Sequence, residues 1–426
     1  GATANRNAPA SLTGSVTLGM NTSMVLLPSQ PMRKRLWDKR VGYFVNNFTR
    51  FSDTQHKTQR ESFIARYRLV PRDVKAYRQG RLVEPVKPII YYIDPATPKK
   101  WVPYLIKGVE DWNVAFEAAG FKNSNMSVDD ARYCVIRYLP AEIENAYGPH
   151  VSDPRSGEII ESHICWYHNV MSLLTKWYMV QCGPLDKRAQ TMTFDDKLMG
   201  ELIRFVSSHE VGHTLGLMHN MGASYAFPVD SLRSPSFTQK YGTTPSIMDY
   251  ARNNYVAQPG DLERGVRMVP PIIGVYDIHA INWGYRLFKD TKTPEDEYKY
   301  LNAIIEAKKG DPMYKFGAQQ LFLTVDPTDQ MEDLGDDHMK ANNYGIKNLK
   351  KIIANIPQWL GVKNDDYEEI QEMYKACLSQ YMRYLTHVMP YLGGVEYTDL
   401  VQDGSKEYAK AYISKAKQKA AMEWLV

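Results

Sequence analysis

One short stretch of the chain carries side chains that could bind a metal ion. It reads His209-Glu210-Val211-Gly212-His213-Thr214-Leu215-Gly216-Leu217-Met218-His219, an H-E-x-x-H-x-x-G-x-x-H pattern. On a helix, His209 and His213 lie one turn apart on one face, so both imidazoles can reach one ion at about 2.0 to 2.1 Å. Gly216 can adopt a positive φ and end the helix, which would bring His219 back as a third ligand. The pattern therefore predicts a zinc site.

The same stretch also carries a candidate general base. Three neutral histidines leave a fourth zinc position for water, an arrangement typical of catalytic sites and not of structural ones. Glu210 directly follows the first ligand, so its carboxylate could take the proton of an attacking water and pass it to a leaving amine. The pattern favours hydrolysis but fixes only the nucleophile, so an amide or ester other than a peptide bond stays open as substrate.

The elements around this stretch decide whether the pattern is more than chance. Thr193 and Asp196 fit a T-x-x-D capping pattern, and apolar residues then recur every three or four positions up to His213, which predicts a helix with the histidines on its inner face. A bare H-E-x-x-H can occur by chance on any amphipathic helix. The longer pattern on a capped apolar helix favours function.

Upstream, the chain alternates between strand and helix signals. A compact apolar strand is predicted at 88–93, and a helix then begins at Thr97-Pro98 and ends at Gly120. Two more strands are predicted at 132–139 and 159–167. This order indicates an α+β fold.

A second signal lies downstream, at Ser246-Ile247-Met248-Asp249-Tyr250. Together with the histidine pattern, it resembles the metzincin clan of zinc metallopeptidases, whose S-x-M-x-Y Met-turn lies beneath the zinc. The resemblance implies a metzincin-like catalytic domain with a twisted mixed sheet, an active-site helix and the Met-turn, in which Met248 packs under the histidines. It also implies that Tyr250 binds zinc at rest or donates to the transition-state oxyanion. A buried structural tyrosine is the alternative, because the chain has 29 tyrosines. Asn220 departs from the aspartate of several metzincin families.

Residues from about 31 to 330 also resemble a largely uncharacterised family of exported bacterial metzincin-like proteins. The stretches that suggest it are 40–44, 147–157, 248–253 and 332–337. The resemblance implies a protein that acts in the periplasm or at the cell surface. Since the chain starts Gly1-Ala2-Thr3, we expect a processed or trimmed start.

The metzincin resemblance further implies a protein or peptide substrate. The strand at 159–167 would be the edge strand above the active-site helix, where an extended peptide pairs its backbone. Residues that bind the substrate side chains are not readable from the sequence. A catalytically silent zinc protein that binds surface glycoprotein or glycan is the rival hypothesis, and the complete set of candidate residues argues against it.

The chain of 426 residues is long enough for more than one domain. We expect a β-rich N-terminal segment at 1–85, the metzincin-like catalytic domain at 86–290 and a helical C-terminal region at 291–426. Amphipathic helices are predicted in this last region at 343–360, 366–389 and 406–425.

Composition excludes several classes of partner. The net charge is only +4 and the basic residues are spread along the chain, so no nucleic-acid partner is expected. No apolar run approaches the roughly 18 residues of a membrane span. The four cysteines have no C-x-x-C pair, which favours buried free thiols over a Cys165–Cys182 bridge.

Two further groups of residues could have a function, or could be ordinary surface or hydrogen-bonded residues. His163 and His168 could touch substrate or a second metal, although lone histidines more often lie on the surface or in hydrogen bonds. An acidic cluster could bind calcium, but a solvated loop is favoured because the D-x-D-x-D-G order is missing. Its members are Asp326, Asp329, Glu332, Asp333, Asp336 and Asp337.

Overall fold

The computed structural model describes residues 14–15, 22, 24–128, 134–269, 273–362, 365–402 and 406–426. It divides into two compact units, Gly1–Pro31 and Met32–Val426, and every element below belongs to the second unit. The first two residues of the strand expected at 132–139 lie outside the described residues.

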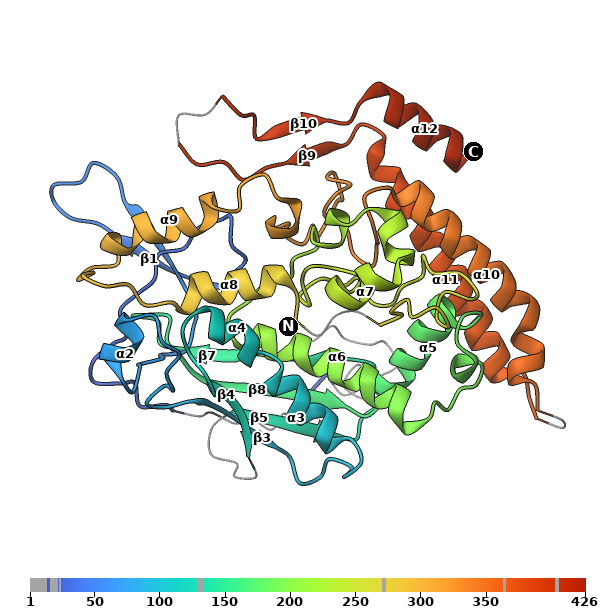
Figure 1. Ribbon diagram of the computed structural model, residues 1–426, viewed down its shortest axis with the longest axis horizontal. Helices are drawn as coiled ribbons and strands as arrows, with labels where there is room; N and C mark the ends of the chain where they lie inside the picture. The colour runs from blue at the N-terminus through green and yellow to red at the C-terminus, as the bar shows by residue number, and fades with distance from the viewer. Residues whose placement is uncertain are drawn as a thin grey trace. The chain divides into compact units, whose positions relative to one another are not determined.

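A six-stranded mixed sheet forms one layer of the larger unit (Figure 1). Its strands are β3 (Ile89–Ile93), β4 (Asn125–Val128), β5 (Cys134–Leu139), β6 (Ala146–Tyr147), β7 (His150–Ser152) and β8 (Ile159–Tyr167). They follow the order β4-β3-β5-β8-β6, and β7 also pairs with β8. The first four run parallel, while β6 and β7 are antiparallel to β8.

The edge strand is therefore not the expected one, and the prediction of β8 as the edge was wrong. β8 is paired on both sides, with β5 through Ile136↔Ile164 and with β6 through Tyr147↔Cys165. On this side of the sheet, the outermost segment is the short stretch 146–152. Its Gly- and Pro-rich sequence lacks the alternation that identifies a strand.

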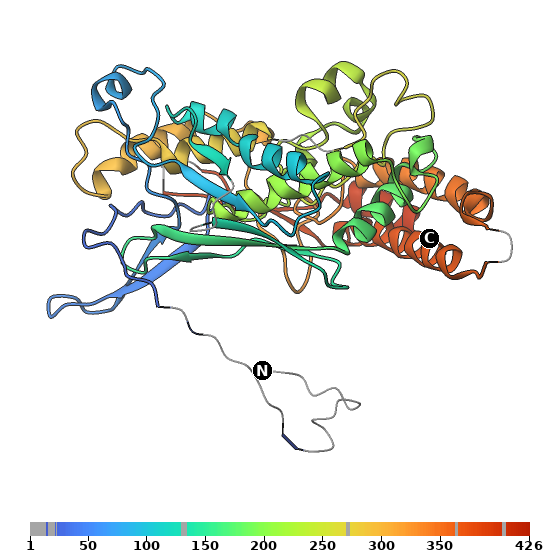
Figure 2. The same cartoon turned by 90° about the horizontal axis from the view of Figure 1, so that it is seen from below.

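Helices α3 (Val102–Glu110), α4 (Asn113–Ala118) and α6 (Asp196–Thr214) lie on one side of the sheet, as Figure 2 shows. The helix expected from Thr97 to Gly120 is divided at Asp111 and Trp112, where the Trp112 indole donates to the Ser208 carbonyl over 2.9 Å. α6 begins two residues later than the capping pattern suggested. The Asp195 carboxylate, and not Thr193, accepts from the first-turn nitrogens of Lys197 and Leu198.

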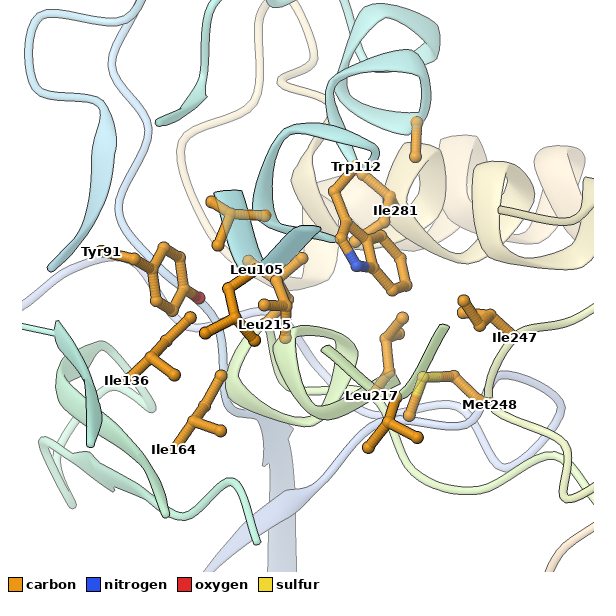
Figure 3. Close-up of a cluster of buried hydrophobic side chains, with 14 of the residues drawn as sticks. Tyr91, Leu105, Trp112, Ile136, Ile164, Leu215, Leu217, Ile247, Met248 and Ile281 are labelled. Atoms are coloured by element: carbon orange, nitrogen blue, oxygen red, sulfur yellow. The ribbon is translucent and has the colours of Figure 1, made fainter. Parts of the chain in front are cut away.

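The main core lies between the sheet and these helices. In the cluster of Figure 3, sheet residues such as Ile136 and Ile164 face Leu215, at the end of α6, while Trp112 and Met248 pack nearby. The cluster draws on residues from Val41 to Leu301, so segments outside 86–290 share this core. The domain boundaries themselves stay a prediction.

The N-terminal part of this unit contributes a hairpin, β1 (Val45–Arg50) with β2 (Gln59–Ile64), and the short helix α2 (Val74–Arg78). Helices α8 (Val275–Tyr285) and α9 (Tyr298–Glu306) close the core from the C-terminal side. The remaining short elements are α7 (Pro235–Tyr241) and the 3-10 turns η1 (Lys187–Ala189), η2 (Ser224–Ala226), η3 (Val229–Arg233), η4 (Glu295–Glu297), η5 (Pro312–Tyr314) and η6 (Met389–Tyr391).

In the C-terminal region, α10 (His338–Leu360) and α11 (Glu368–Val388) lie side by side and pack against α5 (Val170–Cys182) (Figure 1). The helix expected at 406–425 is shorter. Residues 410–412 form β10, which pairs with β9 (Val395–Tyr397), and α12 (Lys415–Leu425) begins after Ser414, whose hydroxyl accepts from Lys417 N.

The four cysteines are free thiols, as predicted, and three of them are buried. Among the helices that the structure describes, none has the length and apolar character needed to cross a membrane.

Candidate metal centre

The three histidines meet at the C-terminal end of α6. His209 and His213 lie on the last turns of the helix, and Gly216 then takes φ +100°, which turns the chain back toward His219. A side chain is excluded at Gly216, because a Cβ would stand 2.2 Å from the Ala65 carbonyl oxygen. The Nε2 atoms of His213 and His219 are 3.0 Å apart, and one nitrogen from each of the three rings lies within 4.8 Å of the others.

The other nitrogen of each ring faces an oxygen acceptor. His209 Nδ1 lies 2.7 Å from the Ile247 carbonyl, and His213 Nδ1 lies 2.9 Å from the Leu217 carbonyl. His219 Nδ1 lies 3.0 Å from Oε1 of Gln319. These acceptors require Nδ1–H donors, so the proton of each neutral ring sits on Nδ1 and the Nε2 lone pairs point toward one another.

Burial keeps these rings neutral. It lowers the pKa of His209 well below its usual value and the pKa of His213 to about 3, and the neighbouring histidines act in the same direction. His209 Nε2 is buried without a hydrogen-bond partner. A buried polar atom without a partner is costly, and zinc accepts three such nitrogens, so the donor set fits this ion. Within the described part of the chain, the histidines form the one His/Cys/Asp/Glu group of three close enough to hold a metal.

Glu210 is buried beside the histidines and contacts the sheet edge. Burial raises its pKa to about 8, and a hydrogen bond from the Gly148 N–H opposes that shift. Gly148 lies so close that a Cβ there would stand 2.8 Å from the Glu210 carbonyl and 3.2 Å from its Oε2. Gly148, which directly follows β6, is thus in close contact with the candidate base.

Met248 lies against α6, between the first two histidines of the motif. A Cβ on Gly212 would stand 2.3 Å from the Met248 Sδ and 2.7 Å from the Trp112 ring. Asp277, on the first turn of α8, holds the chain around Met248 in place. Its carboxylate accepts from Ile247 N, from Gly274 N and from the Ser246 hydroxyl, at 2.7 to 2.8 Å.

Tyr250 is half-buried and faces the histidines. Its ring centroid is 4.4 Å from that of His219 and 5.4 Å from that of His209. Burial raises the pKa of its phenol, so the group is a proton donor at neutral pH. Behind it, the Arg252 guanidinium lies 5.6 Å from the Tyr250 ring, stacks at 3.1 Å over Trp177 and pairs with Glu332.

Glu210, His213, His219 and Tyr250 line a pocket of about 580 Å³. The lining includes the segment from Asn145 to His150 at the sheet edge, and Gln319 and Leu321 from the C-terminal region. The complete lining is Phe44, Asn145, Ala146, Tyr147, Gly148, Pro149, His150, Glu210, His213, Met218, His219, Tyr250, Gln319 and Leu321.

The sequence did not identify the N-terminal contribution to this site. Tyr43 bridges antiparallel to Leu217, and the Phe44 N–H donates to the Gly216 carbonyl over 2.8 Å. The Phe44 ring then lies 5.9 Å from the His213 ring. Three residues of the pocket lining were not predicted from the sequence: Phe44, Gly148 and Gln319. The first two lie in stretches that suggested the family, 40–44 and 147–157.

The acidic cluster is not a solvated loop, and that prediction was wrong. Four of its residues are buried and their carboxylates bind protein donors: Asp326, Asp329, Glu332 and Asp333. Asp333, for example, lies 2.8 Å from His338 Nε2. The partners of the others are Thr328 N and Tyr397 N for Asp326, Lys315 for Asp329, Arg252 and Arg383 for Glu332, Val229 N for Asp336 and Lys340 N for Asp337.

The two isolated histidines have local partners. His163 Nε2 lies 2.5 Å from the Glu161 carboxylate, and His168 Nδ1 contacts the Tyr138 hydroxyl. Neither residue is among those that line the metal pocket.

An α+β fold with a mixed sheet, a histidine-bearing helix and a methionine beneath it defines a metzincin-like protein. A family model described as Met-zincin matches residues 191–426, more than half of the chain, and the chain belongs to this family. Membership places it among metallopeptidase-type hydrolases and implies zinc and a protein or peptide substrate. Residues 2–72 match a model described as a domain of unknown function (DUF5117). No curated protein and no solved structure matched the chain.

Proposed function

We propose that the protein is a zinc-dependent endopeptidase that hydrolyses internal peptide bonds. The observation that carries this proposal is the convergence of three histidine rings beside an open pocket that His213, His219 and the buried Glu210 line. Zinc bound by His209, His213 and His219 supplies a Lewis acid that acidifies water and polarises a carbonyl. In its ionised form, which a zinc cation beside it would favour, Glu210 takes the proton of the attacking water on its carboxylate and returns it to the leaving amine nitrogen.

The sheet edge supports an extended substrate. A peptide that lies along 146–152 adds a strand to the sheet and passes directly over Gly148 and Glu210. Such main-chain pairing needs no chain terminus, which favours cleavage at internal bonds. The pocket also offers apolar surface, because Leu321, one of its lining residues, is 74% exposed.

Tyr250 completes the proposed machinery. Its phenol, beside His219, donates a hydrogen bond to the oxyanion that forms when water attacks the carbonyl carbon. Gly216 and Met248 support the site without touching substrate.

The test combines zinc content with cleavage. The full chain is purified without added metal, zinc is measured by elemental analysis, and a mixed peptide library is digested with and without chelator. Glu210→Gln is compared with Glu201→Gln, which makes the same change at an exposed position of the same helix. We expect about one zinc per chain in all three proteins, and an activity loss of about 10²- to 10⁴-fold in Glu210→Gln alone.

Each alternative has its own result. Zinc without cleavage in any protein would favour the silent binding protein for glycoprotein or glycan. Cleavage that survives in Glu210→Gln would overturn the mechanism, and wild-type protein without zinc would overturn the proposal. Mass spectrometry of the products separates internal from terminal cleavage.

We also propose that the protein works outside the cytoplasm, in the bacterial periplasm or at the cell surface. The support is the resemblance of the stretches at 40–44, 147–157, 248–253 and 332–337 to exported proteins. Fractionation of cells that express the native gene tests this, and recovery in the cytoplasmic fraction alone would contradict it.

A further inference from the structure

The acceptors of the three histidines differ in kind. For His209 and His213, the acceptor is a main-chain carbonyl, which belongs to the Met248 turn or to the end of the motif itself. For His219, the acceptor is the side-chain oxygen of Gln319, 100 residues further along the chain. The orientation of the third ring therefore depends on a residue of the C-terminal region.

That region is fastened to the motif by Asn220, the residue that follows the third histidine. The fully buried Asn220 side chain donates to the Lys315 carbonyl over 3.0 Å and accepts from Gly317 N over 2.8 Å. Met221 N adds a bond of 2.8 Å to the Gly317 carbonyl. The chain at 315–317 thus runs directly beside the residues after His219.

Packing fixes the same segment. A Cβ on Gly317 would stand 2.8 Å from the Gly222 Cα, so two glycines let the backbones approach. The Phe316 ring stacks on Tyr276 with an interplanar angle of 17° and fills the space over Gly42. Gln319 lies two residues beyond Gly317, so the fixed backbone at 315–317 places its side chain next to His219.

We infer that Gln319 is the positioning residue of the third zinc ligand and that the C-terminal region completes the metal centre. Its carbonyl oxygen holds the His219 ring in the Nδ1–H tautomer and keeps the Nε2 lone pair on the metal. Partners of this kind orient metal-ligating histidines, and their removal costs about 10- to 100-fold in metal affinity. The inference rests on the zinc binding of the proposed function and not on peptide hydrolysis.

The experiment measures zinc affinity of the full chain by competition with a chromophoric chelator. Gln319→Leu removes the acceptor at similar size, and Gln319→Glu keeps an acceptor oxygen at the same place. Gln320→Leu is the control for the loop, because the Gln320 amide bonds to residues 325, 326 and 329 and not to His219. Thermal unfolding of the zinc-free proteins reports any loss of fold.

We expect Gln319→Leu to weaken zinc binding about 10- to 100-fold with an unchanged zinc-free melting temperature, and Gln319→Glu to restore the affinity. Wild-type affinity in Gln319→Leu would overturn the inference while leaving the proposed function intact. Equal weakening in the Leu and Glu variants, or in Gln320→Leu, would assign the effect to the loop and also overturn it. Failure of the wild type to bind zinc would overturn both proposals.

Discussion

Gly212 lies so close to Met248 that the Cβ of any other residue would stand 2.3 Å from the methionine sulfur. The Trp112 ring blocks the other direction at 2.7 Å. The middle of the histidine motif is thus held between a methionine and a tryptophan, both fully buried.

Gly212→Ala should therefore destabilise the protein despite the better helix propensity of alanine. Overpacking of this kind costs about 1–3 kcal/mol, and it would displace the helix turn between His209 and His213. Denaturant unfolding measures the loss, and chelator competition measures the zinc affinity. Gly200→Ala is the matched change on α6: the three atoms nearest to its Cβ, at 2.2 to 2.4 Å, belong to the outer end of the half-buried Tyr104 ring, which can shift toward solvent, so a smaller loss is expected. Equal stability of wild type and Gly212→Ala would contradict the packing described for this turn.

Tyr250→Phe separates the two roles considered for this residue. As an oxyanion donor, the phenol acts only in the transition state, so its removal should lower kcat about 10²- to 10³-fold with little change in KM. Peptide cleavage at several substrate concentrations gives both constants. Tyr374→Phe makes the same change at an exposed position of α11, outside the pocket lining, and should leave kcat unchanged. A stable variant with full kcat would make Tyr250 a structural residue.

Asp277 should make stability depend on pH. Burial raises its pKa to about 7, and its hydrogen bonds from Ile247, Gly274 and Ser246 oppose that shift only in part. Because the folded state holds this proton more tightly than the unfolded chain, the free energy of unfolding falls as pH rises from about 4 to about 7. Above that range no further loss from this group is expected.

The measurement compares wild type with Asp277→Asn and Asp277→Leu by denaturant unfolding of zinc-free protein between pH 4 and 8. The asparagine can accept from both backbone nitrogens and donate to the Ser246 oxygen, so it should remove the share of the pH dependence that Asp277 contributes and keep the fold. The leucine leaves two buried N–H groups without acceptors and should be destabilised at every pH. The same pH slope in Asp277→Asn and wild type would refute the assignment to Asp277.

Glu332 should contribute more to the free energy of unfolding than Arg383, one of the two arginines with which it pairs. Its carboxylate, 7% exposed, pairs with Arg252, 12% exposed, and with Arg383, 38% exposed. Glu332→Gln leaves the Arg252 charge buried without a counter-ion and should cost about 3–5 kcal/mol of unfolding free energy. Arg383→Met breaks a half-exposed pair and should cost about 1 kcal/mol or less. Thermal unfolding compares the two variants, and similar losses would argue against this ranking.

The sequence predicted those features of the site that depend on residues only a few positions apart. The spacing of His209 and His213 on one helix face, and the positive φ at Gly216, follow from residue types a few positions apart. The strands at 89–93 and 159–167 were predicted because apolar and β-branched runs are distinctive. The family resemblance identified the Met248 turn, which spacing alone could not.

Those local patterns could not predict contacts between residues that lie far apart in the sequence. Gly148, Phe44 and Gln319 touch the site through backbone pairing and loop anchoring across 60 to 170 residues, and their neighbours in sequence carry no periodic signal. Strands of two or three residues, such as β6, are too short for alternation to appear. The cap of α6 moved to Asp195 because an aspartate closer to the first turn satisfies two backbone donors at once.

The bond between His219 and Gln319 also sets an order of events during synthesis. A ribosome adds about 5–20 residues per second. Several seconds therefore pass between the synthesis of His219 and the synthesis of Gln319. During that interval the nascent protein carries the full histidine motif but lacks the anchor for the last ring. The metal centre that we propose would therefore reach its full zinc affinity only after the C-terminal region has emerged.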